Sequence, residues 1–180
     1  MSKIVKKILF VLMPLDFQDV EFVEPYTTLK NDGHHVEVAG FNANPAVGTF
    51  GYVQKPDYVL GDMTPQDFDT YDALVIPGGK GSTEYLWNNE ELQDVVCYFH
   101  EQNKLVATIC YACIVPAQAE ILTNRQATVY PTDEAKAIFK EHQVIFSENE
   151  CIILPDEKII TCQGPQFAQK FAQAILNFLN

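Results

Sequence analysis

Short apolar runs alternate with amphipathic stretches along most of the chain. Apolar runs occupy residues 7–13, 73–76 and 105–109, and stretches with apolar residues at every third or fourth position lie between them. Strands buried on both faces give continuous apolar runs, whereas helices that cover a sheet give the second pattern. The alternation therefore predicts an α/β fold with a parallel central sheet between helices.

Start and stop signals place the connecting helices. Thr64 and Pro65 are typical of a helix start, because the hydroxyl can cap the first turn and Pro fits its first position. Helices are expected over residues 19–31, from 64 onward, and over 83–102, 114–122, 132–141 and 165–179. Further strands are expected at 35–40, 127–129, 144–146, 151–154 and 158–161. Gly and Pro within 42–61 predict a small edge β-hairpin, and residues 1–180 read as a single domain.

The charge balance limits the partners of the protein. Twelve Lys and Arg against 24 Asp and Glu give a net charge of −12, which argues against nucleic acid or an anionic membrane surface. The apolar run that follows Lys3, Lys6 and Lys7 imitates a signal peptide, but Pro14 breaks it and no A-x-A cleavage pattern follows. A buried strand explains this run better. No segment approaches the roughly 18 apolar residues that a membrane span requires.

The cysteine count points to a reducing compartment. Five Cys is an odd number in a chain long enough to build a core, so a disulfide framework is not expected and the cytoplasm is favoured. The Cys and His residues are scattered without the spacing of metal ligands, so we expect no metal site and no cofactor.

Candidate site residues gather at one edge of the predicted sheet. Ligands of open parallel sheets bind beyond the carboxyl ends of the strands. That edge holds Asp16 to Glu21, Gly78, Gly79, Cys110, Tyr111, Tyr130, Gln163 and Gly164. The histidines His34, His35, His100 and His142 all precede predicted strands and belong to the opposite edge. A Cys–His dyad within one chain is therefore not expected.

Cys110 is the strongest single candidate for a reactive residue. It ends an apolar strand and begins a helix without a Gly, Pro or Asn to ease the turn, so a strained bend is expected there. A helix N-terminus stabilises a thiolate, which would lower the pKa of Cys110. The alternative is a buried, inert cysteine, and position alone does not decide between them.

Glu21 is the natural partner of Cys110. It follows the first strand at the same edge and lies beside an apolar stripe, so burial would raise its pKa and let it move a proton at neutral pH. Pro25 cannot donate to the carbonyl of residue 21, so the helix is either kinked there or begins near Glu24. A solvated surface carboxylate is the alternative for Glu21.

Main-chain groups complete the expected site. The N–H groups of Gly79 and Tyr111 would form an oxyanion hole, and Gly78, Tyr130 and Asp16 would line a pocket. Cys110 and Cys113 also form a C-x-x-C pair, which is typical of redox dithiols. Because Cys113 falls in an apolar stretch, a packed core thiol is favoured.

Five segments in order resemble the ThiJ/PfpI superfamily of small flavodoxin-like proteins. They are Asp19 to Glu21 followed by Pro25, Ala73 to Gly79, Ala107 to Cys110, Ala127 to Pro131 and Ile160 to Pro165. The resemblance implies a flavodoxin-like fold, a reactive Cys110, Glu21 as the acid, the amides of Gly79 and Tyr111 as oxyanion donors, and a homodimer.

Two departures from that family bear on the reaction. Hydrolase-like members carry His directly after the cysteine, where this chain has Tyr111, and other members carry His where this chain has Tyr130. A peptidase is therefore disfavoured. An enzyme acting on small reactive aldehydes of the glyoxalase or deglycase type, an oxidative-stress protein in which Cys110 is oxidised, and a binding module without turnover remain as alternatives.

Overall fold

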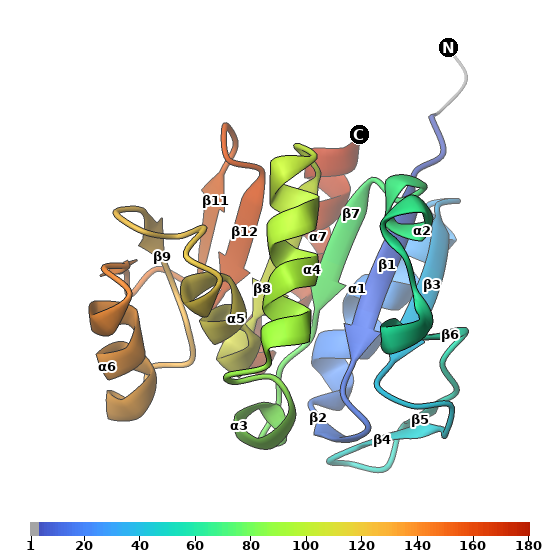
Figure 1. Ribbon diagram of the computed structural model, residues 1–180, viewed down its shortest axis with the longest axis horizontal. Helices are drawn as coiled ribbons and strands as arrows, with labels where there is room; N and C mark the ends of the chain where they lie inside the picture. The colour runs from blue at the N-terminus through green and yellow to red at the C-terminus, as the bar shows by residue number, and fades with distance from the viewer. Residues whose placement is uncertain (1–3) are drawn as a thin grey trace.

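A mostly parallel sheet forms the centre of the protein. The computed structural model describes residues 4–180, so Lys3 lies outside the described residues. Within this range the main sheet has the strand order β11-β12-β8-β7-β1-β3-β6 (Figure 1). Its strands are β1 (Lys7–Leu12), β3 (His35–Gly40), β6 (Tyr58–Val59), β7 (Ala73–Ile76), β8 (Leu105–Ile109), β11 (Cys151–Leu154) and β12 (Ile159–Cys162). Only β11 runs antiparallel to its neighbour among these strands.

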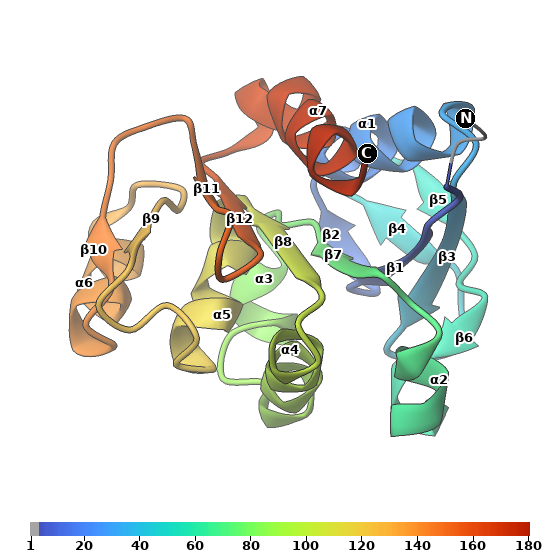
Figure 2. The ribbon, with the colours of Figure 1, turned by 90° about the horizontal axis from the view of Figure 1, so that it is seen from above.

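Helices cover both faces of the sheet, which confirms the predicted flavodoxin-like α/β architecture. Helices α1 (Asp19–Asn31) and α7 (Ala168–Leu179) lie together on one face, and α2 (Pro65–Asp69), α4 (Glu90–Glu101) and α5 (Ile114–Gln118) lie on the other (Figure 2). Phe10 of β1 packs edge-to-face against Phe22 of α1, with ring centroids 5.6 Å apart, so the strand and its crossover helix share one core. None of the helices in residues 4–180 is both long and apolar enough to cross a membrane.

The order of strands reverses between β1 and β7. From β1 the chain crosses to β3 on one side, and it then returns to β7 on the other side of β1. The helices that follow β1 and β7 therefore diverge, and the loops at the carboxyl ends of these two strands lie at the edge where ligands of such sheets bind. The candidate site lies at this edge.

The expected edge hairpin is only partly confirmed. Strands β4 (Ala46–Gly48) and β5 (Val53–Gln54) pair antiparallel, but β4 also pairs with β2 (Leu15–Phe17), which makes a separate three-stranded sheet. Both carboxylate oxygens of Asp19 hold this hairpin, accepting from Phe50 N at 2.9 Å and Tyr52 N at 2.8 Å. Of the strands within residues 42–61, only β6 joins the main sheet, where it pairs with β3. Likewise β9 (Gln126–Ala127) and β10 (Ile145–Phe146) pair with each other outside it, beside α6 (Asp133–Glu141).

Three helix predictions need correction. The single helix expected over residues 83–102 is two helices, α3 (Ser82–Tyr85) and α4, because Asn88 takes a φ of 58° and the Asn89 side chain caps α4 by accepting from Leu92 N. The helix expected over 114–122 ends at Gln118, near a positive φ at Glu120. The last helix begins with a 3₁₀ turn, η3 (Pro165–Phe167).

One disulfide joins two of the five cysteines, although no disulfide framework was expected. Cys151 and Cys162 lie directly opposite each other in the β11–β12 ladder, with Cα atoms 4.1 Å apart, and are bonded. Five cysteines allow as many as two pairs, and it is the strand register that brings these two residues together. Cys97, Cys110 and Cys113 are free, as expected for some of the thiols.

Candidate active site

The segments that follow β1, β7 and β8 bring Glu21, Gly78 and Cys110 together at one edge of the sheet. Glu21 lies in the first turn of α1, Gly78 follows β7 after Pro77, and Cys110 directly follows β8. The N–H of Gly78 donates to Glu21 Oε2 at 2.8 Å, and the Gly78 carbonyl accepts from Gln18 N at 2.8 Å. The sequence correctly placed all three residues at one edge of the sheet.

Gly78 is required by the close approach of these loops. A Cβ at this position would lie 2.7 Å from the Ile109 carbonyl oxygen, 2.9 Å from Cys110 Cβ and 3.0 Å from Glu21 Oε2. Gly79 follows with a φ of 131°, which L-residues rarely adopt, and a Cβ there would lie 2.4 Å from Gln18 N. The Gly-Gly pair therefore allows the loop after β7 to pass between the other two loops.

Glu21 is fully buried, which excludes the alternative of a solvated surface carboxylate. Burial raises its pKa to about 8, and the hydrogen bonds from Gly78 and Cys110 oppose the shift without reversing it. Its Oε1 has no hydrogen-bond partner of ordinary geometry among the described residues. Helix α1 begins at Asp19 and continues through Pro25, so a start near Glu24 is wrong. At neutral pH Glu21 is mostly protonated and can donate a proton.

Cys110 occupies the strained bend that the sequence predicted. Its φ is 60°, a left-handed conformation that costs a non-glycine residue about 1–2 kcal/mol. The residue is 4% exposed and begins a 3₁₀ turn, η2 (Cys110–Cys113), before α5. Strain of this kind persists only where the surrounding structure holds it, and it is concentrated at functional sites.

Burial decides the protonation of Cys110. Desolvation and then the nearby Glu21 carboxylate raise the pKa of the thiol, while the N–H of Tyr111, which points at the sulfur, lowers it. The expectation of a lowered pKa is therefore wrong for the resting protein, because burial outweighs the effect of the short 3₁₀ turn. Cys110 and Glu21 form a buried pair that holds its protons at neutral pH.

The main-chain N–H groups near Cys110 differ in their hydrogen-bond partners. The N–H of Gly78 is committed to Glu21, whereas the N–H of Gly79 has no acceptor within residues 4–180. The N–H of Tyr111 points at the Cys110 sulfur. Assignment of the Gly79 and Tyr111 amides as oxyanion donors stays a prediction.

An aromatic group lies beside the reactive loop. The Tyr111 ring packs against Tyr130 and Trp87, with centroids 5.1 and 5.7 Å away, and Trp87 Nε1 donates to the Tyr111 carbonyl at 2.9 Å. Tyr130 is 37% exposed, so it can face a ligand. Trp87 was missed by the sequence reasoning, although it is the single Trp of the chain.

Asp16 lies in the short strand β2 that follows β1, with a φ of 61°. Its carbonyl accepts from Gly81 N at 3.2 Å, and its carboxylate pairs with Lys80 Nζ at 3.5 Å. The residue therefore joins the loops after β1 and β7, and a role for it in lining a pocket stays a prediction.

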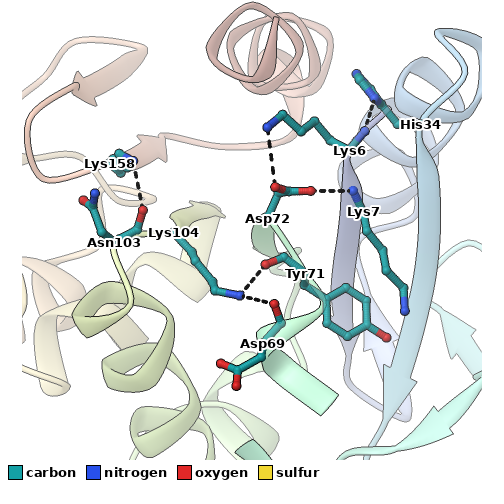
Figure 3. Close-up of polar contacts among 9 residues, drawn as sticks. All are labelled: Lys6, Lys7, His34, Asp69, Tyr71, Asp72, Asn103, Lys104 and Lys158. Atoms are coloured by element: carbon teal, nitrogen blue, oxygen red, sulfur yellow. Dashed lines mark hydrogen bonds and ion pairs between the residues drawn. The ribbon is translucent and has the colours of Figure 1, made fainter. Parts of the chain in front are cut away.

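The histidines lie away from Cys110. His34 is at the opposite edge, where its Nδ1 accepts from Lys6 N at 3.1 Å within a polar cluster that also holds Asp72 and Lys104 (Figure 3). His142 precedes β10, which is outside the main sheet, so its position before a strand does not assign it to either edge of that sheet. No histidine is among the groups in residues 4–180 that shift the pKa of Cys110.

Cys113 is the packed thiol that the sequence favoured. It is fully buried, Thr108 Oγ1 donates to its sulfur at 3.3 Å, and its thiol donates to the Cys162 carbonyl at 3.5 Å. Burial raises its pKa to about 12. It is therefore not poised as a reactive partner of Cys110.

Known proteins are similar to this chain in sequence and in fold. The chain matches the DJ-1/PfpI family over residues 6–178. It is 36% identical over 170 residues to an uncharacterised protein of Methanocaldococcus jannaschii, covering 94% of this chain and 80% of that protein. It is 37% identical over 124 residues to the deglycase PfpI of Pyrococcus furiosus, covering 69% of this chain and 72% of that protein.

A solved structure shows the same fold. The ThiJ/PfpI domain protein from Brachyspira murdochii superposes with a TM-score of 0.88 at 24% identity, covering 99% of this chain and 98% of that one. The two structures therefore share their architecture over essentially the whole chain. Together with the family match over residues 6–178, these findings establish that the chain belongs to the DJ-1/PfpI family.

Proposed function

We propose that this protein is a cysteine-dependent enzyme that acts on small reactive aldehydes, of the glyoxalase or deglycase type. The observation that carries the proposal is the buried contact of Cys110 with Glu21, whose pKa is raised to about 8. A carboxyl group with such a pKa can give and take a proton near neutral pH. Relatives named deglycases support the same reaction class.

The first step is addition of the thiol to an aldehyde. Cys110 Sγ forms a bond to the carbonyl carbon of a 2-oxoaldehyde, the C=O π bond breaks, and the thiol proton passes through Glu21 to the new alkoxide. The product is a hemithioacetal. The amides of Gly79 and Tyr111 stabilise the negative charge on oxygen while it forms.

The second step uses Glu21 as a base and then as an acid. Its carboxylate removes the proton from the carbon bonded to sulfur, and the electron pair moves toward the neighbouring carbonyl, whose oxygen takes up a proton to give an enediol. Return of a proton to the neighbouring carbon and loss of the hydroxyl proton from the carbon bonded to sulfur then give a thioester of a 2-hydroxy acid. Water then cleaves the thioester and restores the thiol. The sum is one 2-oxoaldehyde plus one water giving one 2-hydroxy acid, without an external oxidant.

Turnover of methylglyoxal tests this function. Purified protein should convert methylglyoxal into lactate, and Cys110→Ser should lower kcat/KM by at least about 100-fold because the nucleophile is lost. Cys97→Ser is the matched control, because Cys97 lies half-buried on α4 and is expected to leave the rate unchanged. Absence of turnover by the wild-type protein rejects the proposal.

A second candidate function is a response to oxidants without turnover. It is favoured by the same contact, since protonated Glu21 can donate to an oxygen of a sulfinic acid formed on Cys110. Mild peroxide should then add two oxygen atoms at Cys110 before any other thiol, as measured by peptide mass spectrometry. Preferential oxidation of Cys97 contradicts this candidate.

We also propose that the protein acts as a homodimer in the cytoplasm. Support for the dimer comes from the family resemblance alone, and support for the cytoplasm comes from the odd number of cysteines in a chain long enough to build a core. Sedimentation velocity at micromolar concentration should give the mass of two chains, and the mass of one chain contradicts the dimer.

A further inference from the structure

The disulfide lies at the open end of a β-hairpin. Cys151 is the first residue of β11 and Cys162 is the last residue of β12, so the bond closes the end that lies away from the connecting turn. Immediately beyond it, Gln163 N donates to the Glu150 carbonyl at 2.8 Å. Within the described main sheet β11 pairs only with β12, and the bond therefore fastens an edge strand to the body of the sheet (Figure 2).

The same hairpin end is connected to the reactive loop. Cys162 is paired with Ile109 in the parallel β12–β8 ladder, and Ile109 directly precedes Cys110. The Cys162 carbonyl accepts from the Cys113 thiol at 3.5 Å, which holds the 3₁₀ turn that begins with Cys110. A movement of β12 at Cys162 therefore reaches both ends of this turn.

The segment after β12 borders the aromatic side of the site. A Cβ on Gly164 would lie 3.1 Å from Tyr130 Cδ2, so main chain and ring are in close contact. Tyr130 in turn packs against Tyr111, with ring centroids 5.1 Å apart. The disulfide thus fixes a strand whose last residue contacts the reactive loop and whose continuation contacts the pocket side chain.

We propose that Cys151 and Cys162 form a thiol-exchange site for low-molecular-weight thiols, and that its redox state controls access to Cys110. Cys151 is half-buried and Cys162 is fully buried, so an incoming thiolate reaches Cys151 first. The S–S bond breaks, a mixed disulfide forms on Cys151, and Cys162 leaves as a thiolate. A second thiol then attacks the mixed disulfide, which yields two protein thiols and one oxidised low-molecular-weight disulfide.

The geometry indicates which redox state exposes Cys110. In the oxidised protein the hairpin end is fixed and Cys110 is only 4% exposed. Reduction removes the covalent link and leaves the edge strand held by its ladder, so local opening beside Ile109 becomes more frequent. Cys110 is therefore more accessible in the reduced protein and shielded in the oxidised one. This site is independent of the chemistry proposed for Cys110.

A redox titration of the full chain tests the proposal. The protein is equilibrated in glutathione buffers of graded reduced-to-oxidised ratio, thiols are trapped by alkylation, and mass spectrometry gives the reduced fraction of Cys151 and Cys162. In parallel, the initial rate of Cys110 alkylation by iodoacetamide is measured at each ratio. The rate is expected to rise about threefold or more, in step with reduction of the pair.

Variants separate this site from the other thiols. Cys151→Ser with Cys162→Ser should give the faster alkylation rate at every ratio, whereas Cys97→Ser should follow the wild-type curve. If the double variant does not fold, the wild-type titration still decides, because it needs no substitution. Resistance of the bond to fully reduced glutathione, or equal Cys110 rates in both redox states, overturns the proposal.

Discussion

The N–H of Gly78 donates to Oε2 of Glu21 across 2.8 Å, and this hydrogen bond joins the loop after β7 to the first turn of α1. It orients a fully buried carboxyl group toward Cys110 and opposes the rise in pKa that burial causes. Without it the pKa of the carboxyl group would be higher still. The contact therefore keeps Glu21 in the range where a proton can be both given and accepted.

Removing the titratable group of Glu21 should stop proton transfer while preserving its place in the fold. In Glu21→Gln the amide oxygen can still accept from Gly78 N, but the side chain can no longer carry the proton of Cys110. We expect kcat/KM for methylglyoxal to fall by about 100-fold or more, and the transition near pH 8 to disappear from the pH profile. Steady-state rates from pH 6 to 9 measure both effects.

The control for this experiment is Glu24→Gln. Glu24 lies on the same helix one turn onward and is exposed, so the same substitution there removes a carboxyl group without touching the site. Its activity should equal that of the wild type. A Glu21→Gln variant that keeps the wild-type rate and pH profile would show that Glu21 is not the acid/base.

Burial of Glu21 also makes stability depend on pH. The pKa rises from 4.5 to about 8 on folding, so the folded protein binds the proton more tightly than the unfolded chain. This contribution is fully present below pH 4.5 and is lost as pH rises through about 8. Within that window one proton changes the free energy of unfolding by about 1.4 kcal/mol per pH unit at most.

The comparison with Glu21→Gln isolates this contribution. We expect the free energy of unfolding of the wild type, relative to the variant, to fall by about 2 kcal/mol or more between pH 5 and pH 8. Urea denaturation at each pH measures it. A constant difference across this range would mean that Glu21 ionises at its ordinary pKa and is not desolvated.

The close contacts at Gly78 predict a steric penalty. Gly78→Ala would place a methyl group against the Ile109 carbonyl oxygen and the side chains of Cys110 and Glu21, so a loss of about 1–3 kcal/mol in the free energy of unfolding is expected. Gly61→Ala is the control. Its Cβ would meet only Glu91 Oε1 at 3.2 Å, the end of a flexible side chain. Equal stability of the two variants would contradict the close packing of the three loops.

The sequence was sufficient to place three candidate residues at one edge of the sheet because the ends of the strands are encoded in apolar runs. Glu21, Gly78 and Cys110 each follow such a run, and the carboxyl ends of parallel strands share one edge. The extent of burial was not accessible in this way. Glu21 is enclosed by the loops after β7 and β8, which come from distant parts of the chain, so its pKa depends on contacts that no local pattern shows.

The errors share a physical cause. The apolar periodicity continues through Asn88, where a single positive φ breaks the helix. The spacing of apolar residues does not show where the backbone takes a left-handed conformation. The Cys151–Cys162 pair depends on the register of two adjacent strands, and composition could only count the thiols. Local patterns thus predict elements, while their junctions and cross-strand partners follow from the assembled fold.

The left-handed conformation of Cys110 makes a last prediction that distinguishes strain from simple burial. At a φ of 60° Gly has no steric penalty, so Cys110→Gly should be more stable than Cys110→Ala by about 1 kcal/mol. Cys113 is the matched control, because it lies in the same turn, is fully buried and has a φ of −64°. There the order should reverse, with Cys113→Gly less stable than Cys113→Ala by about 1 kcal/mol. Urea denaturation of the four variants measures both differences, and the same order at the two positions would show that the bend at Cys110 stores no strain.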